Sequence, residues 1–210
     1  MAARFFINGG VNNLWSSTTN WSTTSGGAGG SSVPGLSDAV TLDTNSPNCT
    51  VDGTTGLLVA SLDCSTYTNQ LTLNNIIICG GNITLGSSMQ PILGNGAFSF
   101  TSAGTKQFTS NGIKVPNLVL NATSPTVQLI DDIYVRKCFY FAGTNFLTGG
   151  KTVVALGGTI FITSTSSTTI TATLNNLNPT KMGCNGSIAA NNSKQILIGY
   201  NQSHNYSKGT

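Results

Sequence analysis

The chain has 210 residues, a net charge of +3 and only 7% charged residues. Its 39% of hydrophobic residues can build a core, which excludes an intrinsically disordered protein. The basic residues are spread singly apart from Arg136 and Lys137, which excludes the concentrated basic patch of a nucleic-acid-binding protein. No stretch approaches the ~18 apolar residues of a membrane helix. We therefore expect neither a nucleic-acid partner nor membrane insertion.

The residue types indicate an all-β fold. Ser, Thr, Asn and Gly account for 101 of the 210 residues, and all six acidic residues are Asp. Helix surfaces usually carry Glu, Lys, Gln and Arg, of which the first is missing and the others are scarce. Hydroxyl and amide groups must therefore provide the solubility that charged side chains provide in most other proteins.

The chain opens with MAARFFINGG, whose apolar run covers only residues 5–7. A secretory signal needs a longer apolar region, so we expect synthesis in the cytoplasm of the producing cell and release by a route such as lysis. The stretch ARFFI is either an ordinary first strand or, through Phe5 and Phe6, a docking segment.

Both tryptophans, Trp15 and Trp21, lie in a polar stretch rich in Gly and Ser. Their flat rings could stack on the apolar faces of sugars. Alternatively, they could plug the open end of a repeating fold, which must be covered to prevent aggregation. We favour the lid, and we assign residues 1–43 to an N-terminal docking strand and capping loop.

From residue 39 onward, short apolar or alternating runs are separated by turn residues, which is typical of β-strands. These runs include AVTLD at 39, LLVASL at 57, IIIC at 76, NLVL at 117, IYVRKCFYF at 133, TVVAL at 152, TIFIT at 159 and QILIGY at 195. Between residues 113 and 174 the spacing favours coils of roughly 20 to 25 residues. We predict a short right-handed parallel β-helix over residues 44–174, with a β-sandwich or jelly roll as the alternative.

Five cysteines, an odd number, cannot all pair within one chain; they are Cys49, Cys64, Cys79, Cys138 and Cys184. The first three are evenly spaced, and this spacing could stack them on successive coils. We expect buried, reduced thiols. Because His204 is the single histidine and the spacing is not that of a zinc site, we expect no metal and no cofactor.

Asp131 and Asp132 form the one adjacent carboxylate pair. Neighbouring side chains of a strand point to opposite faces, so this pair alone cannot form a glycosidase site. We expect these residues and the isolated aspartates to cap turns. Nucleophile and phosphate-binding motifs are absent from the sequence, and we therefore expect no enzyme and no catalytic residue.

Two stretches carry a resemblance to a known group of proteins. The first is NGGVNNLWSSTTNWSTTSGGAGGSSVPGLSDAVTLD, with Trp15, NWS at 20–22, a Gly–Ser run, Pro34, Asp38 and the strand at 40–43. It resembles the opening module of β-solenoid proteins of phages and environmental bacteria. The second, from NLVL at 117 to TIFITS at 159, is similar to the coils that follow this module. It departs from them at Arg136 and Lys137, where such coils carry Thr or Ser. The exposed face of this coil is therefore a candidate contact surface.

The resemblance implies a non-enzymatic structural protein of a tailed-bacteriophage virion, exposed as a capsid decoration, head fibre or tail fibre. Expected partners are capsid or tail proteins and host surface glycans. The abundant hydroxyls also suggest self-association, as a homotrimer or a larger array. The alternatives are a carbohydrate- or receptor-binding adhesin and an extracellular filament or matrix subunit.

The candidate binding residues are the aromatic and basic side chains that could face a ligand: Trp15, Trp21, Tyr134, Arg136, Phe139 and Tyr140. Residues 175–210 resemble nothing known, and we assign them to a C-terminal cap or interaction segment.

Overall fold

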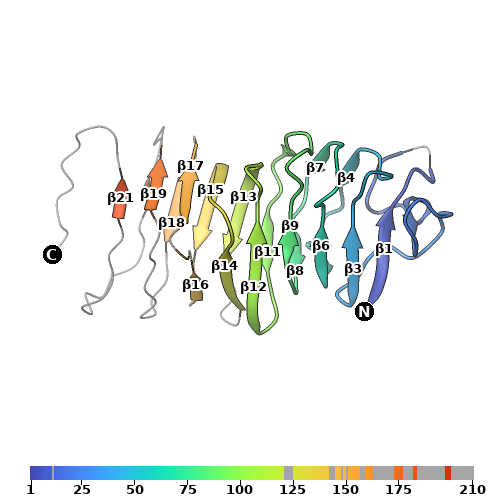
Figure 1. The fold of residues 1–210 in the computed structure, drawn as a ribbon, viewed down its shortest axis with the longest axis horizontal. Coiled ribbons are helices and arrows are strands. Elements are labelled where there is room, and N and C mark those ends of the chain that lie inside the picture. The colour runs from blue at the N-terminus through green and yellow to red at the C-terminus, as the bar shows by residue number, and fades with distance from the viewer. Residues whose placement is uncertain are drawn as a thin grey trace.

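The computed structural model describes residues 1–10, 12–120, 125–141, 145–147, 149 and 151–156, together with strand residues 159–162, 173–176, 182–183 and 197–199. These residues form β-strands and one short 3-10 helix, η1 (Thr18–Asn20). The strands follow one another along a single axis in chain order (Figure 1). The predicted β-solenoid is therefore confirmed. The alternative of a sandwich or jelly roll is wrong, because those folds are built from antiparallel strands and nearly all pairs here are parallel.

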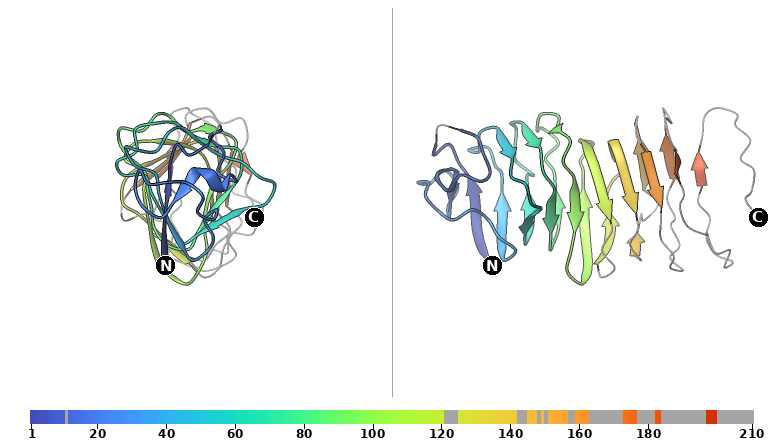
Figure 2. Two further views of the ribbon diagram at one scale, coloured as in Figure 1. Left: turned by 90° about the vertical axis from the view of Figure 1, so that its right-hand side faces the viewer. Right: turned by 180° about the vertical axis from the view of Figure 1, so that it is seen from behind.

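The strands form three sheets that run along the axis and enclose one interior (Figure 2). The eight-stranded sheet contains β1 (Ala2–Phe6), β2 (Trp21–Ser22), β3 (Asp38–Thr41), β6 (Ser61–Asp63), β9 (Ile83–Thr84), β12 (Gly104–Thr109), β14 (Pro125–Leu129) and β16 (Asn145–Leu147). The three-stranded sheet contains β4 (Cys49–Val51), β7 (Leu71–Leu73) and β10 (Leu93–Gly94). The ten-stranded sheet contains β5 (Leu57–Val59), β8 (Ile77–Cys79), β11 (Phe98–Phe100), β13 (Lys114–Leu120), β15 (Ile133–Phe141), β17 (Thr152–Ala155), β18 (Thr159–Ile162), β19 (Thr173–Asn176), β20 (Met182–Gly183) and β21 (Leu197–Gly199). Each early coil visits the three sheets in turn.

The length of one coil follows from the register of the strands. Thr126 of β14 pairs with Asn145 of β16, and Ile83 of β9 pairs with Phe108 of β12. Within the region 113–174, for which the sequence predicted coils of roughly 20 to 25 residues, Leu118 of β13 pairs with Phe139 of β15, 21 residues further on, so that the prediction is confirmed there. The N-terminal turn that precedes the first complete coil is much longer, because Ala2 of β1 pairs with Asp38 of β3. Its additional residues form the loop that carries both tryptophans.

Equivalent positions of successive coils stack into inward columns. One column contains Leu57, Ile77, Phe98, Leu118 and Phe139, each paired with the next along the ten-stranded sheet. All except the half-buried first member are at most 1% exposed. Burial of such columns removes apolar surface from water and stabilises the fold by roughly 25 cal/mol per Å². The repeat therefore needs apolar residues at fixed offsets, not identical residues.

Corners of the coil rely on side-chain amides and on glycine. Asn117 Nδ2 donates to the carbonyl oxygens of Asn95 and Gly96, both at 2.8 Å, and so ties one coil to the previous one. Gly94 has a φ of +85°, and a Cβ there would lie 2.1 Å from the carbonyl oxygen of Leu73. Only glycine fits this close approach.

The first three cysteines do not stack on one another. Cys49 pairs with Leu71, and Cys79 pairs with Val59, because one coil is longer than the spacing between the cysteines. The prediction of a cysteine column is therefore wrong. The prediction of buried thiols is confirmed for Cys49, Cys64 and Cys79, which are fully buried and free of disulfides. It is wrong for Cys138, which is half-buried at an outward position of β15, and Cys184 lies outside the described residues.

Most of the segment 175–210, which we assigned to a cap or interaction segment, lies outside the described residues. Its described strands continue the ladder, since β21 pairs in parallel with β19 and β20 pairs in parallel with β18. The solenoid ladder thus passes the expected boundary at residue 174.

Candidate functional site

The loop between β1 and β3 folds over the N-terminal end of the coil (Figure 1). Trp15 and Trp21 are both 0% exposed, and their rings meet edge to face with centroids 4.7 Å apart. Phe6 of β1 packs against Trp21 at 5.1 Å, and Trp21 Nε1 donates to the carbonyl oxygen of Trp15 at 2.7 Å. These three side chains form an apolar plug, as the lid interpretation predicts.

This burial decides between the two interpretations of the tryptophans. A ring that stacks on a sugar needs one exposed face. Neither Trp15 nor Trp21 has one, so the prediction that they bind a glycan is wrong. Their large apolar area is used instead to cover the first coil.

Hydrogen bonds tie the lid to the first coil. The backbone amide of Ser16 donates to Asp52 at 2.9 Å, and its hydroxyl donates to the same carboxylate at 2.5 Å. The amide of Trp15 donates to Thr50 O at 2.8 Å, and the amide of Thr50 donates to Asn13 O at 2.7 Å. The lid therefore covers β4 at the edge where a preceding coil would otherwise pair.

Strand β1 is held on both of its edges. It pairs in parallel with β3, and at Phe5 and Phe6 it also pairs antiparallel with β2. A strand whose backbone groups are already paired cannot add to a partner's sheet at those residues. Phe6 is fully buried, so its predicted docking role is wrong. Phe5 is half-buried, and its docking role stays a prediction.

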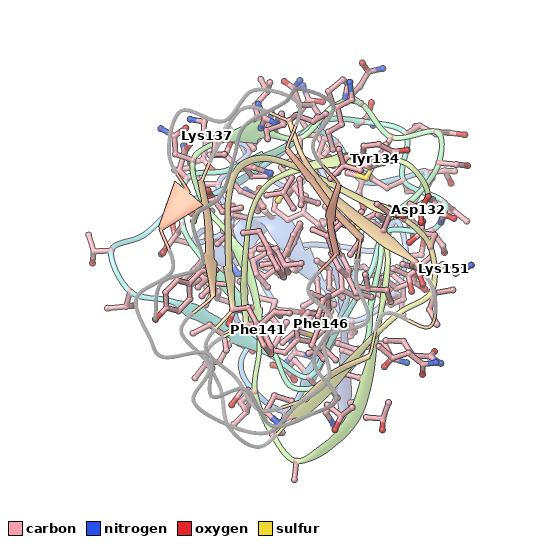
Figure 3. All side chains as sticks on the ribbon, turned by 90° about the vertical axis from the view of Figure 1, so that its left-hand side faces the viewer. Asp132, Tyr134, Lys137, Phe141, Phe146 and Lys151 are labelled. Carbon is pink, nitrogen blue, oxygen red and sulfur yellow. The ribbon has the colours of Figure 1, made fainter. Side chains whose placement is uncertain are left out.

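Arg136 and Lys137 form a β-bulge in β15. The register between β13 and β15 shifts there, so that these two residues lie opposite Pro116, which has no backbone N–H to donate. The strand bends at the bulge. Viewed along the axis, Tyr134, Lys137 and Phe141 lie in turn around the section of the coil (Figure 3).

The bend separates the predicted binding residues. Tyr134 precedes it and Tyr140 follows it, and both are half-buried at outward positions. Because they belong to different faces, they do not form one platform with each other. Phe139 points inward and is 1% exposed. The expected cluster that joined these residues to the lid tryptophans is therefore not formed.

The two basic residues of the bulge reach back over the neighbouring coils. Arg136 Nη2 donates to the carbonyl oxygen of Ile92 at 2.6 Å, in an earlier coil. Lys137 Nζ donates to Asn95 Oδ1, at the corner of an earlier coil. Arg136 is half-buried and Lys137 is exposed. They brace the corner between two faces of the ten-stranded sheet, and their charges lie at this corner.

Every aspartate carboxylate of the chain accepts a hydrogen bond from a backbone amide, at 2.8–3.0 Å. The pairs are Asp38 with Gly35, Asp43 with Asn45, Asp52 with Ser16, Asp63 with Ser65, Asp131 with Ser110, and Asp132 with Thr152. The adjacent pair serves different coils, because Asp131 holds the preceding coil and Asp132 the following one. The prediction that aspartates cap turns is confirmed.

Asp131→Asn should lower the free energy of unfolding by about 1.5–3 kcal/mol, because hydrogen bonds to a charged group are lost and an amide group replaces one acceptor oxygen. The carboxylate accepts the amide of Ser110 at 2.8 Å, its hydroxyl at 3.0 Å and the amide of Asn111. Urea unfolding measures the change. Asp63→Asn is the matched control, since that exposed carboxylate accepts the Ser65 amide, and its cost should be below about 1 kcal/mol. Equal costs for the two variants would contradict the role assigned to Asp131.

A surface that sequence reasoning missed lies on the outside of the ten-stranded sheet. Leu58, Ile78, Ser99, Val119 and Tyr140 pair in succession between residues whose side chains point inward. This outer column carries no charge. Its members recur at a nearly constant offset of one coil, and this offset is the signal that could have found the column once the register was known.

Among the described residues, no group of three or more His, Cys, Asp or Glu side chains could hold a metal ion. The same residues include no helix with the length and apolar character to cross a bilayer. Comparison of the chain with known protein families, with curated proteins and with solved structures gave no match.

Proposed function

We propose that the protein is a non-enzymatic structural component of a virus particle, most closely that of a tailed bacteriophage, displayed on the outside as a capsid decoration, head fibre or tail fibre. The use of all six aspartate carboxylates as backbone acceptors carries this proposal. General acid–base catalysis needs a carboxyl group free to exchange a proton with a substrate. Here each such group is an element of the scaffold.

The mechanism of such a protein is mechanical. Continuous parallel ladders and stacked apolar interiors make a stiff rod. Because the backbone amides in the ladders are hydrogen-bonded, few of them become accessible to proteases. The lid closes one end with Trp15 and Trp21, which prevents end-to-end aggregation of the rods. The resemblance of residues 8–43 to the opening module of phage β-solenoids supports a place on a virion, with synthesis in the cytoplasm of the host.

Peptide mass spectrometry of gradient-purified virions tests this proposal. The protein should co-purify with the particles, and its copy number relative to the major capsid protein distinguishes the positions. On the order of hundreds of copies indicates a decoration of the head, and about a dozen indicates a fibre. Recovery from the lysate or from sheared cell-surface fractions, with none in the particles, would contradict it.

A second candidate is a receptor- or glycan-binding module. It is favoured by one observation: Lys114 of β13 pairs with Tyr134 of β15, which places a cation beside an aromatic ring at outward positions. Tyr134→Ala should then abolish binding on a glycan array, whereas Tyr140→Ala, on another face, should retain it. A purely structural role predicts no loss of binding in either variant.

A further inference from the structure

One face of the ten-stranded sheet is formed by β5, β8 and β11 together with residues 117–120 of β13 and 138–141 of β15, and these segments carry no charged residue. Its central column contains Leu58, Ile78, Ser99, Val119 and Tyr140. Leu58 is 41% exposed, and Ile78, Val119 and Tyr140 are half-buried. Ser99, at the middle of the column, is small and buried, at 3% exposure.

The eight-stranded sheet differs from this face. Its outward positions carry groups that form hydrogen bonds with water, such as Asp63, Asn82, Gln107 and Gln128. The central column of the ten-stranded face carries neither a charged nor an amide side chain, and its polar groups are the hydroxyls of Ser99 and Tyr140. A continuous apolar column on the surface is a candidate contact surface, whereas the exposed Leu93 and Ile130 lie singly on other parts of the coil.

Opposite charges stand at the two ends of one border of this face. Asp52 lies in the corner that joins β4 to β5, in the first coil. Arg136 and Lys137 lie in the equivalent corner of β15, four strands further along. At the usual strand spacing these ends are about 19 Å apart. Uncharged asparagines, among them Asn95 and Asn117, occupy the corners between them.

The whole rod carries the same polarity of charge. Residues 1–100 contain one basic and four acidic residues, a net charge of −3. The described residues between 101 and 156 contain five basic and two acidic residues, a net charge of +3. Because the chain advances along the axis coil by coil, this difference in sequence becomes a difference between the two ends of the solenoid.

We propose that this face binds a second copy of the chain in an antiparallel, two-fold symmetric pair. A two-fold axis along the strand direction at Ser99 places Leu58 opposite Tyr140 of the second copy and Ile78 opposite its Val119. The same rotation keeps the charged borders of both copies on the same side. Asp52 of each copy then faces Arg136 and Lys137 of the other, so that the symmetry produces two equivalent charge contacts. A parallel pair would place this border against the opposite border and would lose both charge contacts. The polarity of charge therefore selects the antiparallel direction.

The size of the face sets the expected affinity. Five strands extend about 19–24 Å along the axis, and the flat part of each strand is about 10 Å wide. This area is well below the ~800 Å² per partner of a standard stable interface. We therefore expect a reversible dimer with a dissociation constant in the micromolar range or above. The inference does not depend on a place in a virion.

Sedimentation of the full chain over a wide range of concentrations tests the face. Leu58→Lys should weaken dimerisation at least tenfold, because it places a charge in the apolar column, opposite Tyr140 of the second copy, at both ends of the interface. Leu93→Lys is the matched control, since Leu93 has almost the same exposure, 43% against 41%, but lies on the three-stranded sheet. Lys137→Asp should also weaken the dimer, because it places a negative charge opposite Asp52 of the second copy. Lys114→Asp is its control, because Lys114 is exposed and does not border the face.

Cross-linking tests the direction in a background with Cys138→Ser and Cys184→Ser, in which the other cysteines are buried. A short bismaleimide should join Leu58→Cys chains to Tyr140→Cys chains in a mixture, and should not join Leu58→Cys chains to one another. Cross-linking among Leu58→Cys chains alone would mean a parallel pair and would overturn the proposal. A monomer at all concentrations, a trimer, or equal effects of the Leu58 and Leu93 variants would overturn it as well.

Discussion

Replacing Trp21 with alanine should lower the free energy of unfolding by about 3–5 kcal/mol and should cause the protein to aggregate. The ring is fully buried between Trp15 and Phe6, so that its removal leaves a cavity under the lid. Loosening of the lid would expose the unpaired edge of the first coil. Urea unfolding measures the first effect, and light scattering of the refolded protein measures the second.

Two further substitutions separate packing from hydrogen bonding in the lid. Trp21→Phe removes the bond from Nε1 to the Trp15 carbonyl, which should cost about 1 kcal/mol beyond the loss of volume. Trp15→Phe should lack this additional cost, because Trp15 Nε1 has no hydrogen-bond partner among the described residues. Leu36→Ala, on the same loop at 52% exposure, should change stability by less than about 0.5 kcal/mol. Unchanged stability of Trp21→Ala would contradict the lid.

The protein should lose stability steeply above about pH 9. Burial raises the pKa of Cys79 from 9.0 to about 11, and hydrogen bonds from backbone groups offset part of this rise. Burial likewise raises the pKa of Cys49 and Cys64, with smaller contributions from nearby acidic groups, and burial raises the pKa of Tyr67. These groups remain neutral in the folded protein at pH values where they ionise in the unfolded chain.

The sign follows from linkage. Folded pKa values above the unfolded ones leave stability intact below about pH 9 and remove it as pH rises towards 11, at about 1.4 kcal/mol per pH unit for each group. Cys79 alone should therefore account for about 2 kcal/mol between these limits. Urea unfolding at pH 7, 9, 10 and 10.5 checks this expectation. Cys64→Ala should flatten the decline, whereas Cys138→Ala, at a half-buried position, should flatten it less. Constant stability up to pH 10.5 would contradict the account.

The architecture of this protein could be predicted from local patterns. Runs such as LLVASL at 57 and IYVRKCFYF at 133 each formed strands, because apolar residues separated by turn residues leave few other ways to bury a core. The aspartates capped turns as expected, since a short carboxylate beside a corner finds free amides nearby. The lid was predicted because two large apolar rings in a polar loop must be buried somewhere.

The candidate site was predicted less well. Tyr134 and Tyr140 lie in the same run, IYVRKCFYF, and a single strand was expected to place both rings on one binding surface. The bulge at Arg136 and Lys137 bends that strand around a corner, and it therefore divides them between two faces. A bulge depends on the register with the adjacent coil, and here the register places two residues opposite Pro116.

Composition and the spacing of apolar runs were sufficient to establish stacked β-strands, corner aspartates and a plugged N-terminal end, because each depends on residues close together in the chain or on total composition. The outer column from Leu58 to Tyr140 and the border from Asp52 to Lys137 emerged only in the folded chain. Successive members of the column lie one full coil apart in the sequence, and the coils differ slightly in length. Each such difference changes which residues become neighbours, so only the tertiary register decided which side chains share a face.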